Sequence, residues 1–307
     1  MINVLIAITP LFLVIFIGAF LEHAKIADKN WSPVLNNFAL KIGLPALIFA
    51  SLAKMDFVFS EQSQLIYVNS LVMICSFLIA LVIGKILRLN RKNFRTFFIC
   101  LGFTNCAYLG FPTLTQIYGE SVLPIASLIV AVYLFWIFTL GIGFLDYTQI
   151  RSHKNLAKKI LLNLIKNPLL IAVFLGLIVA SLGINIPVII NKSIDMLSAS
   201  VTPVVLIVIG LFIGQSKFGN IKKWIPVFIF SIMTLMVIPG LFILGIKLFG
   251  LNLPEFTTSI VISAMPLAIT PFALADTYKL NKGFIARSIV LSTILAIITI
   301  PFWSSIA

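Results

Sequence analysis

The sequence is poor in charged residues and poorest in acidic ones. Only 10% of its 307 residues are charged, and Asp and Glu together number nine. Because soluble domains carry roughly a quarter charged residues, this composition excludes an ordinary soluble globular protein. None of the nine acidic residues lies clearly in the middle of an apolar run, so the sequence shows no obvious proton relay at membrane depth.

Cysteine and histidine are also scarce, with three and two residues. Cys75, Cys100 and Cys106 fall inside apolar runs, with no CxxC spacing and no paired histidine. We interpret them as small buried hydrophobic residues rather than disulfide partners or metal ligands. A membrane-embedded enzyme would need a catalytic histidine, a Ser–His pair or a carboxylate pair at depth, so we expect no enzymatic activity and no cofactor.

The chain is rich in apolar sequence instead. Hydrophobic residues make up 61% of it and the mean hydropathy is +1.15. Apolar runs of about 20 residues recur along the chain, and a run of that length crosses the bilayer core as a helix. The first run lacks a basic segment and a cleavage pattern, so we read it as a mature helix. The sequence predicts an all-α polytopic membrane protein with ten spans, at about residues 3–21, 33–53, 65–87, 97–118, 121–145, 168–184, 194–214, 225–248, 256–276 and 284–305.

The net charge of +13 is explained by basic residues concentrated in the connections on one side of the membrane. Eighteen of the 22 Lys and Arg residues fall in alternate connections, three fall on the opposite side, and Lys41 alone lies within a span. Cytoplasmic loops of membrane proteins carry the excess of basic residues. We therefore expect a plasma-membrane protein with both termini outside the cytoplasm and no nucleic-acid partner.

Prolines recur at matched positions in the two halves of the chain. Three prolines of the first half are followed at offsets of 158, 158 and 159 residues by three of the second: Pro10, Pro45 and Pro112, then Pro168, Pro203 and Pro271. Five spans per half would give the second half the opposite orientation, as in the inverted repeats of many secondary transporters. The alternative is unrelated kink prolines, which membrane helices tolerate. We predict a first repeat at 1–150, a cytoplasmic linker at 151–167 and a second repeat at 168–307.

Two matched spans carry helix-breaking residues near their middle. The fourth contains TNCAYLGFP from Thr104, and the ninth contains SAMPLAITPFALA. Proline removes a backbone donor and clashes with the preceding turn. Interrupted helices in matched positions of two repeats are the best sequence pointer to a binding site. We expect the broken helices 4 and 9 to cross near the midplane, with freed N–H groups and half-helix N-termini facing an anionic ligand.

The candidate substrate-binding residues lie at these two breaks. Asn105 would supply side-chain hydrogen bonds, Tyr108 a ring face or hydroxyl, and Gly110 a close backbone approach. The alternatives are that Asn105 bridges two helices, that Tyr108 is plain core and that Gly110 serves helix packing. The full set is Asn105, Tyr108, Gly110, Pro112, Met265, Pro266, Thr270 and Pro271.

Lys41 lies about eight residues into the second span. A lysine at depth needs a partner or must lose its proton. Three interpretations remain open: Lys41 snorkels to the cytoplasmic face, replaces a bound cation, or pairs with the carboxylate of the substrate. A changed pH dependence of uptake in Lys41→Ala would argue against snorkelling.

These motifs resemble those of the auxin efflux carriers. NCAYLGFP followed by YGE is similar to the fourth-helix pattern of that family, and AMPLAITPFALADTY to its ninth. FALKIGLPALIF and TPVVLIVIGLFIG resemble its second and seventh helices, and the likeness runs from about residue 5 to 305. The resemblance implies two inverted five-helix repeats, a scaffold and a mobile transport domain, and elevator-type alternating access. It also implies that Asn105 contacts a substrate carboxylate and that Pro112 and Pro271 are crossover prolines.

The resemblance further implies a secondary transporter of small organic anions, because bacterial members are commonly labelled malate, malonate or other organic-acid permeases. A bacterial member would lie in the inner membrane. The alternatives are an anion channel and a non-transporting membrane sensor. The expected partners are a small organic anion and the lipid bilayer, with a homodimer left open. Coupling to Na⁺, to H⁺ or to neither is also left open, since carbonyl and amide oxygens can hold Na⁺ without an acidic residue.

Overall fold

The computed structural model describes residues 1–55, 59–149, 155–216 and 223–306, with only the backbone at Phe59 and Glu61. Four of the eighteen basic residues counted above lie outside the described residues: Arg151, Lys154, Lys217 and Lys222. The first four residues of the expected linker, 151–154, lie outside them as well.

Every described element is a helix. The α-helices are α1 (Ile2–His23), α2 (Trp31–Phe38), α3 (Leu44–Ala53), α4 (Phe59–Ile86), α5 (Arg91–Gly102), α6 (Gly110–Tyr118), α7 (Leu123–Trp136), α8 (Gly143–Gln149), α9 (Leu156–Ile165), α10 (Pro168–Ser181), α11 (Val188–Ala199), α12 (Val201–Gln215), α13 (Ile225–Ile232), α14 (Ile238–Leu248), α15 (Thr257–Ser263), α16 (Thr270–Leu274) and α17 (Lys282–Ile306). Three π-helical turns, η1 (Ala39–Gly43), η3 (Ile137–Ile142) and η5 (Met233–Val237), join α2 to α3, α7 to α8 and α13 to α14. Two short 3₁₀ turns, η2 (Glu120–Val122) and η6 (Leu253–Phe256), precede α7 and α15.

Seven helical segments of the described chain are long and apolar enough to cross a membrane. They are Ile2–His23, Trp31–Ala53, Gln62–Ile86, Glu120–Gln149, Val188–Gln215, Ile225–Leu248 and Lys282–Ile306. An eighth is reached if α9 and α10, which bend by 62° at their junction, are counted as one span. The two other expected spans are the fourth and the ninth, whose interruptions leave helices too short to count. The protein is therefore an all-α membrane protein that crosses the bilayer several times.

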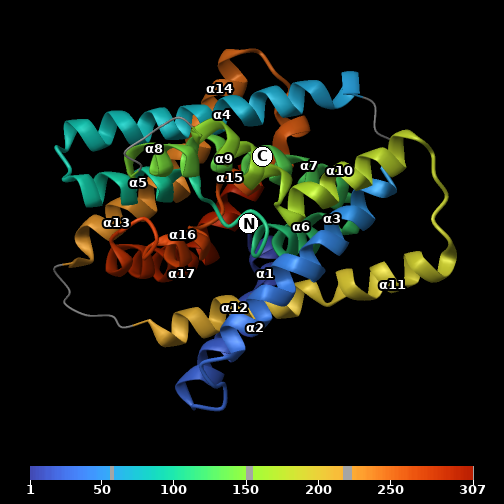
Figure 1. Cartoon of the computed structure of the whole chain (residues 1–307), viewed down its shortest axis with the longest axis horizontal. Helices are drawn as coiled ribbons and strands as arrows, with labels where there is room; N and C mark the ends of the chain where they lie inside the picture. Colours follow the sequence, from blue (N-terminus) through green and yellow to red (C-terminus); the bar gives the residue numbers. More distant parts are fainter. Residues whose placement is uncertain (56–58, 150–154, 217–222, 307) are drawn as a thin grey trace.

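Helices of the two halves pack against each other in a reciprocal way. α1 packs against α12, and α10 packs against α3. Glycine allows both contacts, because small residues let membrane helices approach closely. A Cβ at Gly18 would lie 2.7 Å from the carbonyl oxygen of Ile207, and one at Gly176 would lie 2.9 Å from the Cβ of Leu52. α1 and α12 form one packed pair, in the lower part of Figure 1, and α3 and α10 form another, with η1 in contact with both α10 and α12.

Several other helices pack against one another. Here α4 packs against α5 and α7, while α13 packs against α17. Asn69 of α4 is fully buried and donates from Nδ2 to Ser259 Oγ of α15 at 2.8 Å. Figure 1 shows α4 in the upper part of the molecule and α12 in the lower part, with both chain ends between them.

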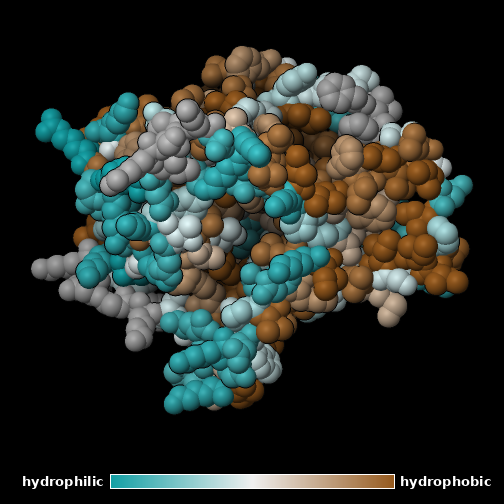
Figure 2. Space-filling model, in the orientation of Figure 1, coloured by the Kyte–Doolittle hydropathy of each residue, from teal (hydrophilic) through white to brown (hydrophobic). Residues whose placement is uncertain are grey.

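The surface separates into polar and apolar regions, as a bilayer requires. Large apolar side chains are exposed on the outer faces of the helices, for example Phe16 at 69% and Ile189 at 82%. In water such exposure would be unfavourable, whereas lipid tails are an apolar solvent for it. Figure 2 shows hydrophilic residues gathered on the left over α5 and α8, and mostly hydrophobic residues on the right over α10 and α11.

Candidate functional site

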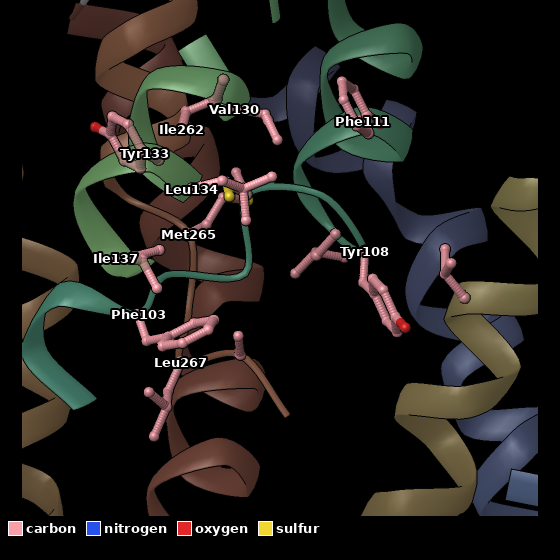
Figure 3. Close-up of a cluster of buried hydrophobic side chains, with 14 of the residues drawn as sticks. Phe103, Tyr108, Phe111, Val130, Tyr133, Leu134, Ile137, Ile262, Met265 and Leu267 are labelled. Carbon is pink, nitrogen blue, oxygen red and sulfur yellow. The ribbon is translucent and has the colours of Figure 1, made fainter. Parts of the chain in front are cut away.

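The two interrupted segments meet and pair. Residues 103–109 separate α5 from α6, and residues 264–269 separate α15 from α16. The Asn105 N–H donates to the Pro266 carbonyl at 2.7 Å, and the Ala268 N–H donates to the Phe103 carbonyl at 3.0 Å. Thr104 and Leu267 thereby form an isolated antiparallel bridge. Figure 3 shows the segment from Phe103 to Tyr108 passing across the chain that carries Met265 and Leu267.

The protein itself satisfies much of the backbone that these breaks release. The Leu267 N–H donates to Ser292 Oγ at 3.1 Å, and the Gly110 N–H donates to the Asn105 carbonyl at 3.1 Å. Unpaired backbone groups in hydrocarbon cost several kcal/mol each, so this pairing stabilises the crossing. The expectation that freed N–H groups face a ligand is therefore wrong for residues 105, 110, 267 and 268.

The prolines begin helices rather than kink them. Pro112 lies in the first turn of α6 and Pro271 in the first turn of α16. In the first turn of a helix the backbone N–H has no partner within the helix, so proline costs no hydrogen bond there. Its ring nevertheless disfavours helix in the residues before it. This explains why each break lies on the N-terminal side of its proline.

Packing within the protein does not require a glycine at position 110. A Cβ there would lie 3.6 Å from the Asn105 carbonyl oxygen and 3.8 Å from Met265 Cγ, which are ordinary contacts. The expected close approach of a ligand to the Gly110 backbone stays a prediction. Gly110 begins α6 directly after the break.

A polar cavity of about 380 Å³ lies beside the crossing. Residues 103–108 line one side of it, and α2, η1, η3 and the α9–α10 junction supply the others. Its polar lining consists of four asparagines, three hydroxyl residues and two lysines: Asn37, Asn105, Asn163, Asn167, Thr104, Tyr108, Thr270, Lys41 and Lys166. Figure 2 shows a hollow near the middle of this face, bordered by hydrophilic residues.

The charge of this cavity is entirely positive among the described residues that line it. Lys41 comes from η1 and Lys166 directly follows α9, and both side chains are exposed. Lys41 is thus not buried and needs no protein partner. No Asp or Glu is among the described lining residues. The cavity offers two cations and several hydrogen-bond donors, which suits an anion.

Asn105 lines this cavity and carries a side-chain donor without a partner in the described protein. The residue is 3% exposed, and its Nδ2 has no hydrogen-bond partner in the described protein. The Oγ1 of Thr104, beside it, is also buried without a partner. Buried polar groups without partners are uncommon in native proteins and point to a missing ligand or water. Tyr108, by contrast, uses its hydroxyl to donate to Asn36 Oδ1 at 2.7 Å.

Only three of the eight candidate residues line the cavity: Asn105, Tyr108 and Thr270. The other five lie at the crossing or at the helix starts next to it and do not line the cavity. Pro266 accepts the hydrogen bond of Asn105, Met265 is fully buried, and Gly110, Pro112 and Pro271 form the starts of α6 and α16.

Several lining residues were missed from the sequence because they lie in the expected linker or at its end. Asn163 and Lys166 belong to α9 and the turn after it. Asn167 caps α10, since its Oδ1 accepts from the Leu169 N–H at 2.9 Å. An Asn directly before Pro168 is the available signal, because this order is typical of a helix start.

One acidic residue of the described chain is buried. Asp146, which directly follows the expected fifth span at 121–145, lies within α8 and is 1% exposed. Its Oδ1 accepts hydrogen bonds from Lys159 Nζ at 2.6 Å and from the Tyr278 hydroxyl at 3.0 Å. Burial raises the pKa of Tyr278, and the neighbouring Asp146 charge raises it further. Asp146 does not line the cavity.

These features define a class of protein. A chain of several membrane-length apolar helices, with a cavity whose described charged lining residues are both lysines, is a multi-pass membrane protein. In the described chain no cluster of three or more His, Cys, Asp or Glu residues could hold a metal ion.

Comparison with known proteins specifies the class. A family model described as "Membrane transport protein" matches residues 3–304, and the chain belongs to that family. It is 27% identical to an uncharacterized transporter of Methanocaldococcus jannaschii over 300 residues, which covers 95% of this chain and 94% of the relative. It is 25% identical to auxin efflux carrier component 8 of Arabidopsis thaliana, with 97% and 95% covered. It is 22% identical to the uncharacterized transporter YfdV of Escherichia coli K12, with 96% and 94% covered. The resemblance to auxin efflux carriers is thereby confirmed.

Proposed function

We propose that this protein is a secondary transporter that binds a small organic anion in the cavity beside the crossing. The observation that carries the proposal is the lining of that cavity, which has Lys41 and Lys166, an unpartnered Asn105 amide and no described acidic residue. Its volume of about 380 Å³ falls in the range of small-molecule sites. The name of the Arabidopsis relative, an auxin carrier, is in keeping with an organic anion as the substrate.

In the proposed complex, the anion lies between the interrupted segment 103–108 and the residues of α2, η1 and α10 that line the cavity. Lys41 and Lys166 attract its charge, and Asn105 Nδ2 donates to one of its oxygens. A carboxylate accepts such bonds strongly, because hydrogen bonds with an ionised partner are about twice as strong as neutral ones. The apolar lining, with Phe103, Leu134 and Ile137 among it, would contact a hydrocarbon portion of the substrate.

The proposed architecture is ten spans in two inverted five-helix repeats, residues 1–150 and 168–307, with broken helices 4 and 9 crossing. The reciprocal packing of α1 on α12 and of α10 on α3 supports it, because a two-fold relation exchanges these pairs. The matched breaks before Pro112 and Pro271 support it as well.

We further propose elevator-type alternating access. The cavity lies between the interrupted segment 103–108 on one side and α2, η1 and the start of α10 on the other, so sliding of one side past the other would move the site. Lys166 and Asn163, which line the cavity, belong to the connection that the basic residues assign to the cytoplasm. The structure then corresponds to an inward-open state, with both termini outside.

Counterflow in proteoliposomes tests this proposal. Vesicles loaded with an unlabelled carboxylate should accumulate the same labelled carboxylate transiently above equilibrium, and initial rates should saturate. A panel of mono- and dicarboxylates, each with and without Na⁺ and a pH gradient, would identify substrate and coupling. Flux that is linear in concentration and shows no counterflow would indicate the anion channel instead, and absence of flux for the whole panel would favour the sensor.

A further inference from the structure

A second polar cavity, of about 410 Å³, lies at the start of α5. It is lined by Arg91, Lys92, Arg95, Thr148, Gln149 and Lys279. Four of these six residues are cationic and none is acidic. None of them lines the cavity beside the crossing, so the two sites are separate.

Two arginines converge in this cavity on a single neutral acceptor. Arg91 and Arg95 both donate from Nη2 to the carbonyl oxygen of Thr148. Arg95 is 8% exposed, and its Nε is buried without a partner in the described protein. A buried cation is unfavourable unless it is paired and hydrogen-bonded. Burial and the neighbouring Arg91 both lower the pKa of Arg95, which lies before the expected fourth span.

The acidic residues of the adjoining elements do not neutralise this cluster. Asp146 of α8 pairs with Lys159, and Asp276, which follows α16, pairs with Lys282. Two guanidinium groups share one neutral carbonyl oxygen, and Arg95 Nε has no partner in the described protein. The positive charge of this cluster is therefore not balanced by a described acidic side chain that lines the cavity.

We propose that this cavity binds a phosphate-type anion, the chemistry shared by phospholipid headgroups and soluble phosphate compounds. Guanidinium groups present planar pairs of donors that match phosphate oxygens. The first turn of α5 adds the partial positive charge of a helix N-terminus. Basic pockets on the cytoplasmic side of membrane proteins lie at the depth of anionic headgroups.

An anion bound in this cavity would affect the crossing through the helices that connect the two. α5 leads directly into the break at residues 103–109, and Lys279 follows α16, which begins after the break at 264–269. An anion that contacts both Arg91 and Lys279 joins the cytoplasmic ends of the two interrupted helices. Occupancy of the cavity therefore stabilises the arrangement of these helices seen in the structure.

Thermal unfolding of the purified full-length protein in detergent tests the inference. One arm adds inorganic phosphate, a second adds phosphatidylglycerol to the micelles, and a third adds phosphatidylcholine, all at matched ionic strength. We expect a saturable rise in unfolding temperature with phosphatidylglycerol, with phosphate, or with both, and none with phosphatidylcholine. A response to phosphatidylglycerol alone identifies a lipid headgroup, and a response to phosphate identifies a soluble ligand.

Variants test whether the rise in unfolding temperature depends on this cavity rather than on general surface charge. Arg91→Gln and Lys279→Gln replace exposed cations on two different elements and should each weaken the response about two- to fivefold, because exposed ion pairs contribute up to about 1 kcal/mol. Lys158→Gln, an exposed lysine of α9 outside the cavity, is the matched control and should respond like wild type. Absence of a response to both anions overturns the proposal, as does an equal loss in Lys158→Gln. Because the readout requires no transported substrate, its failure is distinguishable from failure of the proposed function.

Discussion

The backbone N–H of Asn105 donates to the carbonyl oxygen of Pro266 at 2.7 Å, which joins the two interrupted helices where each loses its own hydrogen bonds. This bond engages the backbone of Asn105 and leaves its side-chain Nδ2 without a partner. The same residue thus holds the crossing together through its backbone, lines the cavity and carries a side-chain donor that is unpaired among the described residues. These two roles can be separated experimentally, because a side-chain substitution keeps the backbone bond.

Asn105→Ala should abolish most transport without unfolding the protein. Loss of a hydrogen bond to a charged group costs about 1.5–3 kcal/mol, or roughly ten- to one-hundredfold in affinity. Carboxylate uptake into proteoliposomes and thermal unfolding in detergent should be measured on the same preparation. An equal loss of folding in Asn105→Ala would favour a structural role for the side chain instead.

Lys41→Gln and Lys166→Gln should each weaken carboxylate affinity about two- to fivefold, because exposed ion pairs contribute up to about 1 kcal/mol. Salt screens such exposed charges, so the deficit should be largest at low ionic strength. The measurement is the Michaelis constant for uptake at two salt concentrations, with Lys158→Gln as the control. A deficit that does not change with salt would count against electrostatic attraction by these lysines.

Cysteines at positions 104 and 267 should form a disulfide across the crossing. Thr104 and Leu267 form the bridged pair between two backbone hydrogen bonds. The Cα atoms of such a pair lie about 4.5 Å apart, which is within reach of a disulfide. Thr104→Cys with Leu267→Cys, in a background with the three native cysteines changed to alanine, should cross-link on mild oxidation, as read by mass spectrometry. A folded double variant that stays reduced would mean that the segments do not pair as described.

Gly210→Ala should destabilise the contact between α1 and α12. A Cβ at Gly210 would lie 2.1 Å from the carbonyl oxygen of Ile15, so the helices would have to separate. Overpacking of this kind costs about 1–3 kcal/mol or more. Gly245→Ala in α14 is the control, because its Cβ would have no neighbour within 4 Å. Thermal unfolding should show a clear loss for Gly210→Ala and little change for Gly245→Ala; similar values for both would refute the packing argument.

The breaks could be predicted from sequence because proline acts on its local backbone. Pro112 and Pro271 disfavour helix in the residues before them wherever the chain goes, and both breaks lie there. The partner of each freed N–H could not be predicted, since it depends on which segment lies opposite. The pairing of Asn105 with Pro266 and of Leu267 with Ser292 is therefore visible only in the structure.

The cavity was predicted less completely for a similar reason. Residues on the interrupted segments were identified by their own chemistry, as with Asn105. Lys166 and Asn163 line the cavity only because α10 and α9 meet at a bend of 62° beside the crossing. Asp146 directly follows an apolar run, and its burial depends on Lys159 and Tyr278 from other elements. No local pattern contains those tertiary contacts.

Equilibrium binding of labelled mono- and dicarboxylates to the purified protein, with and without Na⁺, tests the anion site most directly. Wild type should bind at least one carboxylate saturably, and Asn105→Ala should bind it at least tenfold more weakly while unfolding at a similar temperature. Binding of no carboxylate, or binding that Asn105→Ala leaves unchanged, would contradict the assignment of this cavity to an organic anion.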